Sequence, residues 1–224
     1  SVSNSLTTCG NRSIAVDPWN ENIVYAYDGT ATTLLKTTSG GGTWSALTGY
    51  TGGGGNAIAV NPNTGRVFIT GSTTVFYSDN GGTTWTAAAG STVTGSLYDI
   101  VLNPVGTDTV YVAGSSGGML VLLRSTDGGT TFADVTGATI SGTSTSGARL
   151  AVTPAATGYV YCVNLGGSST PPRIIRSTDR GSSWSVTATS TSTSLAGTSA
   201  TTGLGMSNGQ GFYDLGIMAS PYNA

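Results

Sequence analysis

An internal repeat constrains the fold of this chain more than any other feature of its 224 residues. Two sequence patterns alternate. The first is an apolar run that ends in Pro and soon resumes; its copies begin at residues 13–18, 57–62, 99–104 and 149–154. The second is an apolar run that leads into a glycine-rich turn and an aromatic residue; its copies span residues 34–44, 75–85, 122–132 and 174–184. The period is roughly 40 to 50 residues, which indicates a chain built from similar structural units.

Each period predicts four short β-strands. The first run has apolar side chains at successive positions, which favours an inner strand covered on both faces. The second and third strands follow the Pro turn and precede the glycine turn, and the fourth begins at the aromatic residue. No stretch has the roughly 3.6-residue apolar period of a helix. The sequence therefore predicts an all-β chain, and four-stranded units at this spacing are typical of the antiparallel blades of a β-propeller.

Four complete blades and the first strand of a fifth account for residues 1–224 as a single propeller segment. The expected blades are residues 13–56, 57–98, 99–148 and 149–213, and the fifth opens at residue 214. A lone strand after the fourth blade would leave an exposed sheet edge. We therefore expect a fragment of a six- to eight-bladed ring, completed by further blades of the same polypeptide or by another copy.

The glycine turn resembles the Asp-box, or BNR repeat, whose pattern is Ser-x-Asp-x-Gly-x-Thr-Trp. Three copies keep most of this pattern: Ser78, Asn80, Gly82 and Trp85; Ser125, Asp127, Gly129 and Phe132; and Ser177, Asp179, Gly181 and Trp184. The first copy has Thr37 and Ser39 in place of the Ser and the Asp. Lys36, Arg124 and Arg176 share one register in the third strands, which predicts a repeated role for a cation there.

Asp-boxes occur in sialidase-like, xyloglucanase-like and sortilin-like propellers, and the resemblance implies the same fold here. It also implies that each box lies on the turn between the third and fourth strands, on the face away from the active site of those families. In such a turn Asp or Asn accepts backbone N–H groups, glycine takes a positive φ and the aromatic ring covers the end of the hairpin. We therefore expect Asp127 and Asp179 to be structural.

Composition and charge exclude several functional classes. The 8 Lys and Arg residues are scattered singly, so no basic stripe predicts a nucleic-acid partner. The chain has no His, and Cys9 and Cys162 stand far apart, so we expect no metal and no cofactor. These two cysteines are either joined by a disulfide or are two buried free thiols. No apolar run approaches the roughly 18 residues of a transmembrane helix.

Low charge and abundant Ser and Thr favour a secreted or cell-surface location. Asn11 begins an Asn-Arg-Ser sequon, which makes it a candidate for N-glycosylation. Residues 211–221 resemble blade openings of large repeat proteins that bacteria export by type IX secretion. Under that resemblance, Thr109 is a candidate for O-glycosylation, because it lies in the short Asp-Thr-aliphatic signal of those bacteria.

A candidate site lies where the first strands of the blades begin. Strand direction alternates within a blade, so the long irregular loops share a face with these strand starts, beside the central axis. The fifth residue before each strand-ending Pro forms a column: Ser13, Ala57, Asp99, Arg149 and Gly216. Around this column we expect a ligand-binding cluster of Arg12, Tyr98, Asp99, Arg149, Tyr213 and Asp214.

Two roles are open for this cluster. Asp99 and Asp214 are a candidate acid and base for glycoside hydrolysis, which in an inverting enzyme needs carboxyl groups roughly 6.5 to 9.5 Å apart. Alternatively, the cluster caps strand ends and hydrogen-bonds the water of the central channel. Neither a Ser-His-Asp set nor a phosphate loop is present in the sequence.

The absence of a convincing catalytic set in the sequence favours a binding or scaffold module over an enzyme. The leading hypothesis is an extracellular or cell-surface propeller, part of a larger protein, whose loop face binds a glycan, an adhesion protein or a neighbouring copy. One alternative is a glycoside hydrolase similar to xyloglucanases or sialidases. The other is a structural subunit of an extracellular filament or surface layer.

Overall fold

The computed structural model describes residues 11–29, 32–105, 108–166, 171–189, 217–220 and 222. These residues form strands β1 to β16 and one short helix, α1 (Gly137–Ile140). The strands assemble into four separate 4-stranded sheets, and every pairing within them is antiparallel. The structure thus confirms the prediction of an all-β fold built of four-stranded blades.

We number the sheets as blades 1 to 4 in chain order. Blade 1 contains β1 (Asn11–Asp17), β2 (Asn20–Asp28), β3 (Thr33–Thr37) and β4 (Ser45–Ala46). Blade 2 contains β5 (Ile58–Val60), β6 (Val67–Thr70), β7 (Val75–Ser78) and β8 (Thr86–Ala87). Blade 3 contains β9 (Leu97–Leu102), β10 (Val110–Ser116), β11 (Met119–Ser125) and β12 (Ala133–Asp134). Blade 4 contains β13 (Ala148–Val152), β14 (Val160–Asn164), β15 (Arg173–Ser177) and β16 (Ser185–Thr189).

Two inner strands begin slightly earlier than the expected blade boundaries at residues 13 and 99. In blade 1 the pairing extends past an irregularity to Asn11, which lies opposite Asp28. In blade 3 it extends past an irregularity to Leu97, which lies opposite Gly114. Such irregularities add a residue to one strand without ending the hydrogen-bond ladder. The repeat pattern alone therefore underestimates the length of these strands.

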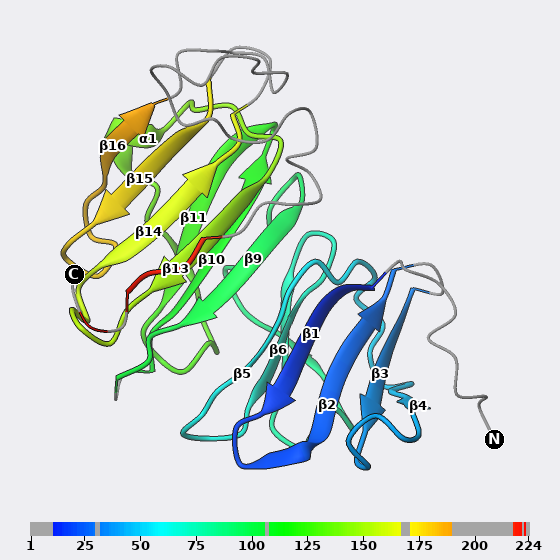
Figure 1. Cartoon of the computed structure of the whole chain (residues 1–224). Helices are drawn as coiled ribbons and strands as arrows, with labels where there is room; N and C mark the ends of the chain where they lie inside the picture. The colour runs from blue at the N-terminus through cyan, green and yellow to red at the C-terminus, as the bar shows by residue number, and fades with distance from the viewer. Residues whose placement is uncertain are drawn as a thin grey trace, which may run out of the picture.

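The blades follow one another in space in the order of the chain (Figure 1). Their inner strands contact in sequence, β1 with β5, β5 with β9 and β9 with β13. Successive side chains of a strand point to opposite faces of its sheet. On β6, Ile69 therefore packs in the cluster with blade 1, whereas Phe68 packs in the cluster with blade 3. The middle strands of blades 2 and 3 are apolar on both faces because each face is covered by a neighbouring blade.

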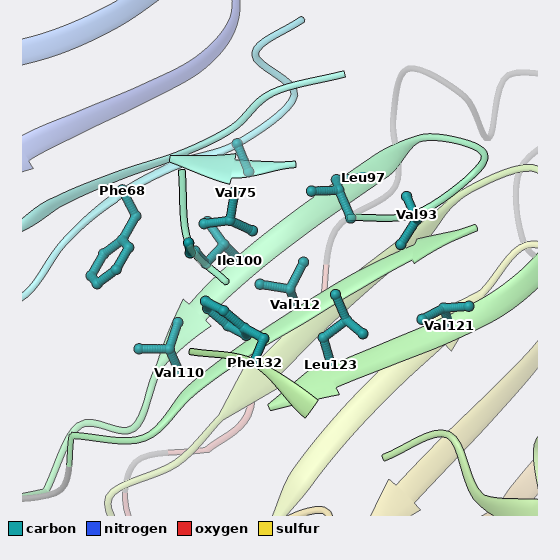
Figure 2. Packing of buried hydrophobic residues seen from close by; sticks show 12 residues of the cluster. Phe68, Val75, Val93, Leu97, Ile100, Val110, Val112, Val121, Leu123 and Phe132 are labelled. Atoms are coloured by element: carbon teal, nitrogen blue, oxygen red, sulfur yellow. The ribbon is translucent and has the colours of Figure 1, made fainter. Parts of the chain in front are cut away.

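The core is divided into clusters that lie between consecutive blades. Figure 2 shows the one between blades 2 and 3, where Phe68 and Val75 face Ile100, Val112 and Phe132. All five side chains are buried. Full burial of such a side chain is worth about 1.5–3 kcal/mol, so the packing between blades, rather than packing within one sheet, holds the array together.

The Asp-boxes lie on the turns between the third and fourth strands, as the resemblance implied. Gly129 shows why the box needs glycine. Its φ of +83° is in the left-handed region, and a Cβ built on it would lie 2.2 Å from a ring carbon of Phe68 in the preceding blade. A larger residue would therefore strain the turn and push blades 2 and 3 apart.

The segment expected to open a fifth blade is described at Ile217–Ser220 and at Tyr222. Thr153, at the end of β13, donates a hydrogen bond from its hydroxyl to the carbonyl oxygen of Ser220. The segment therefore lies against blade 4 beside its inner strand, as the red trace in Figure 1 shows. No sheet pairing is assigned to residues 217–220, and residue 214 lies outside the described residues.

Candidate functional site

A pocket of about 430 Å³ opens where the inner strands of the blades begin. The predicted column supplies one lining residue from each blade: Ser13, Ala57, Asp99 and Arg149. Ile14, Asn56 and Ile58 are the other described residues of the lining. The structure therefore brings together residues that lie far apart in the sequence but occupy equivalent positions in the repeat. Gly216, the fifth member of the column, lies outside the described residues.

Asp99 uses its carboxylate to join two blades. Its Oδ1 accepts a hydrogen bond of 2.9 Å from the backbone N–H of Ile100, and its Oδ2 accepts one of 2.7 Å from the backbone N–H of Leu150 in β13. Burial raises the pKa of Asp99, although the N–H of Leu150, the charge of Arg149 and the N–H of Ile100 each lower it. Both carboxylate oxygens are thus engaged by the backbone.

The same bridge recurs between blades 1 and 2 with a hydroxyl in place of the carboxylate. Ser13 Oγ accepts a hydrogen bond of 2.6 Å from the backbone N–H of Ile58, the residue equivalent to Leu150. Ala57 has no polar group for this role in blade 2. Its neighbour Asn56 instead donates from Nδ2 to the carbonyl oxygen of Leu97 in blade 3. Sequence reasoning missed Asn56, and its position directly before the column was the only available signal.

Arg149 is the cation of the pocket. Its Nη1 donates to the carbonyl oxygens of Tyr98, at 3.1 Å, and of Ala148, at 2.9 Å. The guanidinium group therefore spans the interface between blades 3 and 4 in the direction opposite to Asp99. Because guanidinium carries five N–H donors, Arg149 retains donors for a ligand that enters the pocket.

The remaining members of the predicted cluster do not line this pocket. The side chain of Tyr98 packs against the apolar cluster between blades 3 and 4, and its hydroxyl donates to Ser115 Oγ at 3.2 Å. The backbone of Arg12 lies in β1, but its side chain lies outside the description. Tyr213 and Asp214 also lie outside the described residues. The pairing of Asp99 with Asp214 stays a prediction, and Asp99 is the one carboxylate among the lining residues.

In the Asp-box of blade 3, the hydrogen bonds of the Asp127 carboxylate all lie within its own turn. Asp127 Oδ1 accepts the backbone N–H groups of Thr130, at 3.1 Å, and Thr131, at 3.0 Å, and Oδ2 accepts the hydroxyl of Thr131 at 2.7 Å. Ser125 Oγ donates to Oδ1 and accepts the N–H of Gly129. These hydrogen bonds, led by the one from the backbone of Thr131, lower the pKa of Asp127 to about 2.

Blade 4 repeats this network with Asp179. The hydroxyl and the backbone N–H of Ser183 both donate to the carboxylate, at 2.6 and 2.8 Å, and lower the pKa of Asp179 to about 2. Both box carboxylates are committed to their own turns, which supports the structural role expected for them. Ser177 and Gly181 make the same bond to each other as Ser125 and Gly129.

The boxes that lack Asp keep the geometry with other acceptors. In blade 2, Asn80 Oδ1 accepts the backbone N–H of Thr84 at 2.9 Å, and its Nδ2 donates to the hydroxyl of Thr84. In blade 1, Ser39 Oγ accepts the backbone N–H of Thr43 at 3.0 Å. Trp85 closes its turn by donating from Nε1 to the carbonyl oxygen of Gly82. The turn therefore tolerates any side-chain oxygen that reaches the same N–H group.

The structure also describes the side chains of one of the two cysteines and of one of the two candidate glycosylation positions. Cys162 is a buried free thiol in β14, and burial raises its pKa, whereas Cys9 lies outside the described residues. Thr109 is only 6% exposed, which argues against a glycan on its hydroxyl in the folded protein. The side chain of Asn11 is not described.

The described part of the chain contains no cluster of three or more Cys, Asp or Glu side chains suited to a metal ion. It also contains no helix long and apolar enough to cross a membrane.

Comparison with known proteins agrees with this architecture. Residues 76–87, which contain the box of blade 2, match the BNR/Asp-box repeat model. No curated protein sequence matches the chain. The fold is that of a BNR-type β-propeller, represented here by four successive blades.

Three solved structures illustrate the similarity. A GH74 enzyme from Niastella koreensis is 26% identical with a TM-score of 0.59, over 78% of this chain and 24% of that one. The GH74 xyloglucanase from Xanthomonas campestris is 16% identical with a TM-score of 0.63, over 77% of this chain and 29% of that one. A nidogen/laminin complex contains a chain that is 17% identical with a TM-score of 0.61, over 79% of this chain and 64% of that one. This chain thus spans roughly a quarter of each of these GH74 enzymes.

Proposed function

We propose that the chain is a non-catalytic binding and scaffold module of an extracellular or cell-surface propeller protein, and that its pocket binds a glycan. One observation carries the non-catalytic part of the proposal: Asp99, the one carboxylate among the described residues that line the pocket, is held on both oxygens by the backbone of blades 3 and 4. Hydrolysis by a glycosidase generally needs a pair of carboxyl groups on either side of the scissile bond. A carboxylate fixed between two blades is better suited to setting the shape of a pocket than to exchanging protons with a substrate.

The size and polarity of the pocket support a saccharide ligand. Its volume of about 430 Å³ lies within the range of small-molecule sites. Arg149 supplies N–H donors for sugar hydroxyl or carboxylate oxygens, and Ile14, which is 65% exposed, supplies apolar surface for the ring. The nidogen/laminin neighbour is part of a protein complex, which supports a protein partner for the surrounding loops in addition to the glycan.

Binding can be tested with a panel of neutral and acidic oligosaccharides, measured by calorimetry. Arg149→Ala should weaken the best binder about tenfold or more, because a charge-assisted hydrogen bond is lost. Arg180→Ala is the matched control, since Arg180 lies in the Asp-box turn of blade 4 and not in the pocket. Circular dichroism checks that both variants are folded. No binding to any member of the panel, or equal weakening by both substitutions, would contradict the proposed site.

A glycoside hydrolase is the second candidate, favoured by the xyloglucanase among the structural neighbours. Burial raises the pKa of Asp99, which is the direction that a general acid requires. Release of reducing sugar from xyloglucan by this chain, abolished by Asp99→Asn, would support hydrolysis and overturn the non-catalytic proposal. Binding without measurable hydrolysis would support the module.

A further inference from the structure

A cation joins each described pair of consecutive blades by binding the same atom of the following Asp-box. Counting the Ser or Thr of the box as its first residue, the acceptor is always the backbone carbonyl oxygen of the fourth residue. The donors and acceptors are Lys36 Nζ to Gly81, at 2.9 Å; Arg66 Nη1 to Gly128, at 2.8 Å; and Arg124 Nη1 to Arg180, at 2.8 Å. The prediction of a repeated role for the third-strand cations is therefore explained at two of the three interfaces.

Blade 2 reaches the same carbonyl by another route. Tyr77 occupies the register of Lys36 and Arg124, and it carries no charge. Arg66, directly before β6, lies over the Tyr77 ring at 4.3 Å and supplies the donor instead. Arg66 also donates to the hydroxyl of Thr130 in the box of blade 3. Blade 2 thus keeps the hydrogen bond to the box carbonyl although its third strand has no cation. This indicates that the hydrogen bond itself contributes to the packing of consecutive blades.

An aromatic side chain on the second strand lies beneath the same turn. Tyr25, Phe68 and Tyr111 occupy equivalent positions on β2, β6 and β10 and are 2%, 0% and 1% exposed. A Cβ built on Gly129 would lie 2.2 Å from the Phe68 ring, and one built on Gly181 would lie 3.2 Å from the Tyr111 ring. The cation and the aromatic ring together form a seat for the next Asp-box turn, which we call the turn seat.

Blade 4 carries the same turn seat on its far face. Tyr161 and Arg176 are cross-strand partners on β14 and β15, as Tyr111 and Arg124 are on β10 and β11. No Asp-box turn among the described residues covers this seat: Tyr161 is only half-buried, and Arg176 Nε is buried without a hydrogen-bond partner. The Arg176 guanidinium lies 5.7 Å from the centre of the Tyr159 ring, and Tyr159 contacts Tyr161 edge-on.

We propose that Tyr161 and Arg176 bind the Asp-box turn of a fifth blade, the one that Ile217–Ser220 opens. Three established interfaces of the same kind support this occupant. The position of Ser220 against Thr153 also supports it, because the chain already begins to cover blade 4 there. In the other three seats the contact of the cation with the following box is to a backbone carbonyl oxygen. The expected ligand of Arg176 in the fifth box is therefore the carbonyl oxygen of its fourth residue. Arg66 also pairs with a carboxylate, but that carboxylate belongs to Asp79 of its own blade. The proposal does not depend on glycan binding in the pocket.

The test extends the full chain after Tyr222 by a second copy of residues 64–96, which supply the three outer strands of blade 2 and its Asp-box. Hydrogen exchange of the peptide around Tyr161 is then compared with that of the unextended chain. Docking should slow exchange there about tenfold or more, because covered strands open less often than exposed ones. The urea midpoint should also rise, since stacked repeats stabilise one another.

Arg176→Ala gives the specific readout, and Arg124→Ala is its matched control. Arg176→Ala should lower the urea midpoint of the extended chain and leave that of the unextended chain unchanged. Arg124→Ala should lower both equally, because its seat is occupied in both proteins. Equal effects of Arg176→Ala in the two chains would overturn the proposal.

A second extension controls for the case in which the junction after Tyr222 prevents the first extension from docking. It uses residues 108–147, from blade 3, in place of residues 64–96. Protection of Tyr161 by either extension supports the proposal, and protection by neither overturns it. If the unextended chain self-associates in sedimentation experiments and Arg176→Ala abolishes the association, the occupant is a second copy and the fifth-blade assignment is wrong.

Discussion

Two kinds of carboxylate in this fold make similar hydrogen bonds in opposite surroundings. Asp127, in an exposed Asp-box turn, accepts the backbone N–H groups of Thr130 and Thr131, and Asp99, beside the axis, accepts those of Ile100 and Leu150. The pKa of Asp127 is lowered, whereas burial raises the pKa of Asp99 despite its hydrogen bonds. Burial, rather than the number of hydrogen bonds, therefore decides the direction of the shift.

The two sites also differ in what they connect. Every partner of Asp127 lies within its own turn, so its network is complete once one hairpin has formed. Asp99 binds Leu150 in the next blade, so its network exists only when blades 3 and 4 are docked. Asp127 thus stabilises the turn of a single blade, whereas Asp99 fixes the position of one blade relative to the next. Substitutions can separate these two effects.

The largest effect is expected from Asp99→Ala. Removal of the carboxylate leaves the backbone N–H of Leu150 unpaired at a part-buried blade interface. The free energy of unfolding should fall by about 2–4 kcal/mol, as for other buried groups left without a partner. Urea unfolding at neutral pH measures it. Asp99→Asn keeps one acceptor oxygen and should cost less than half as much; a loss below about 0.5 kcal/mol for Asp99→Ala would show that the bridge is dispensable.

Asp127→Ala should have a smaller effect. The group is exposed and its bonds resemble those of a helix N-cap, so a loss of about 1 kcal/mol is expected after allowance for solvent screening. The same urea experiment measures it. Asp127→Asn is the matched control and should be nearly neutral, because Asn80 already fills this position in blade 2. If Asp127→Ala were as damaging as Asp99→Ala, the distinction between local and interblade networks would fail.

The features that repeat along the chain were accessible from the sequence. Four blades and the Asp-box turns follow from short patterns whose contacts are local, and the axial column of Ser13, Asp99 and Arg149 follows from equivalent positions in the repeat. The contacts between blades were not accessible. That Asp99 reaches Leu150, or that Arg66 replaces the missing third-strand cation, depends on how far apart two sheets pack, and no spacing within one repeat encodes that distance.

The opposite pKa shifts predict opposite responses to acid. The folded-state pKa values of Asp127 and Asp179 lie at about 2, below the unfolded value of about 3.9. Their stabilisation is therefore present above about pH 4 and is lost as the pH falls towards 2. Asp99 has a raised folded-state pKa, so its contribution to stability declines as the pH rises from about 4 through that pKa.

Acid unfolding of two Asn variants separates these contributions. The double variant Asp127→Asn/Asp179→Asn should lose less stability than the natural chain between about pH 5 and about pH 2.5, measured by urea midpoints. Asp99→Asn should lose more over the same interval, because it lacks a carboxyl group whose contribution to stability improves on acidification. Parallel pH profiles for all three proteins would contradict the assigned directions.

The smallest predicted effect is a gain, and it asks whether blade 1 can be given the carboxylate that blades 3 and 4 have. Ser39 Oγ accepts the backbone N–H of Thr43 at 3.0 Å and lies 3.2 Å from the hydroxyl of Thr43. Ser39→Asp should engage both groups with separate oxygens, as Asp127 engages Thr131. A gain of about 0.3–0.5 kcal/mol is expected for an exposed turn, seen as a higher melting temperature at pH 7 that disappears near pH 2. Ser39→Ala should be destabilising, since it leaves the N–H of Thr43 to solvent. A gain that persists at low pH would mean that the added charge is not its source.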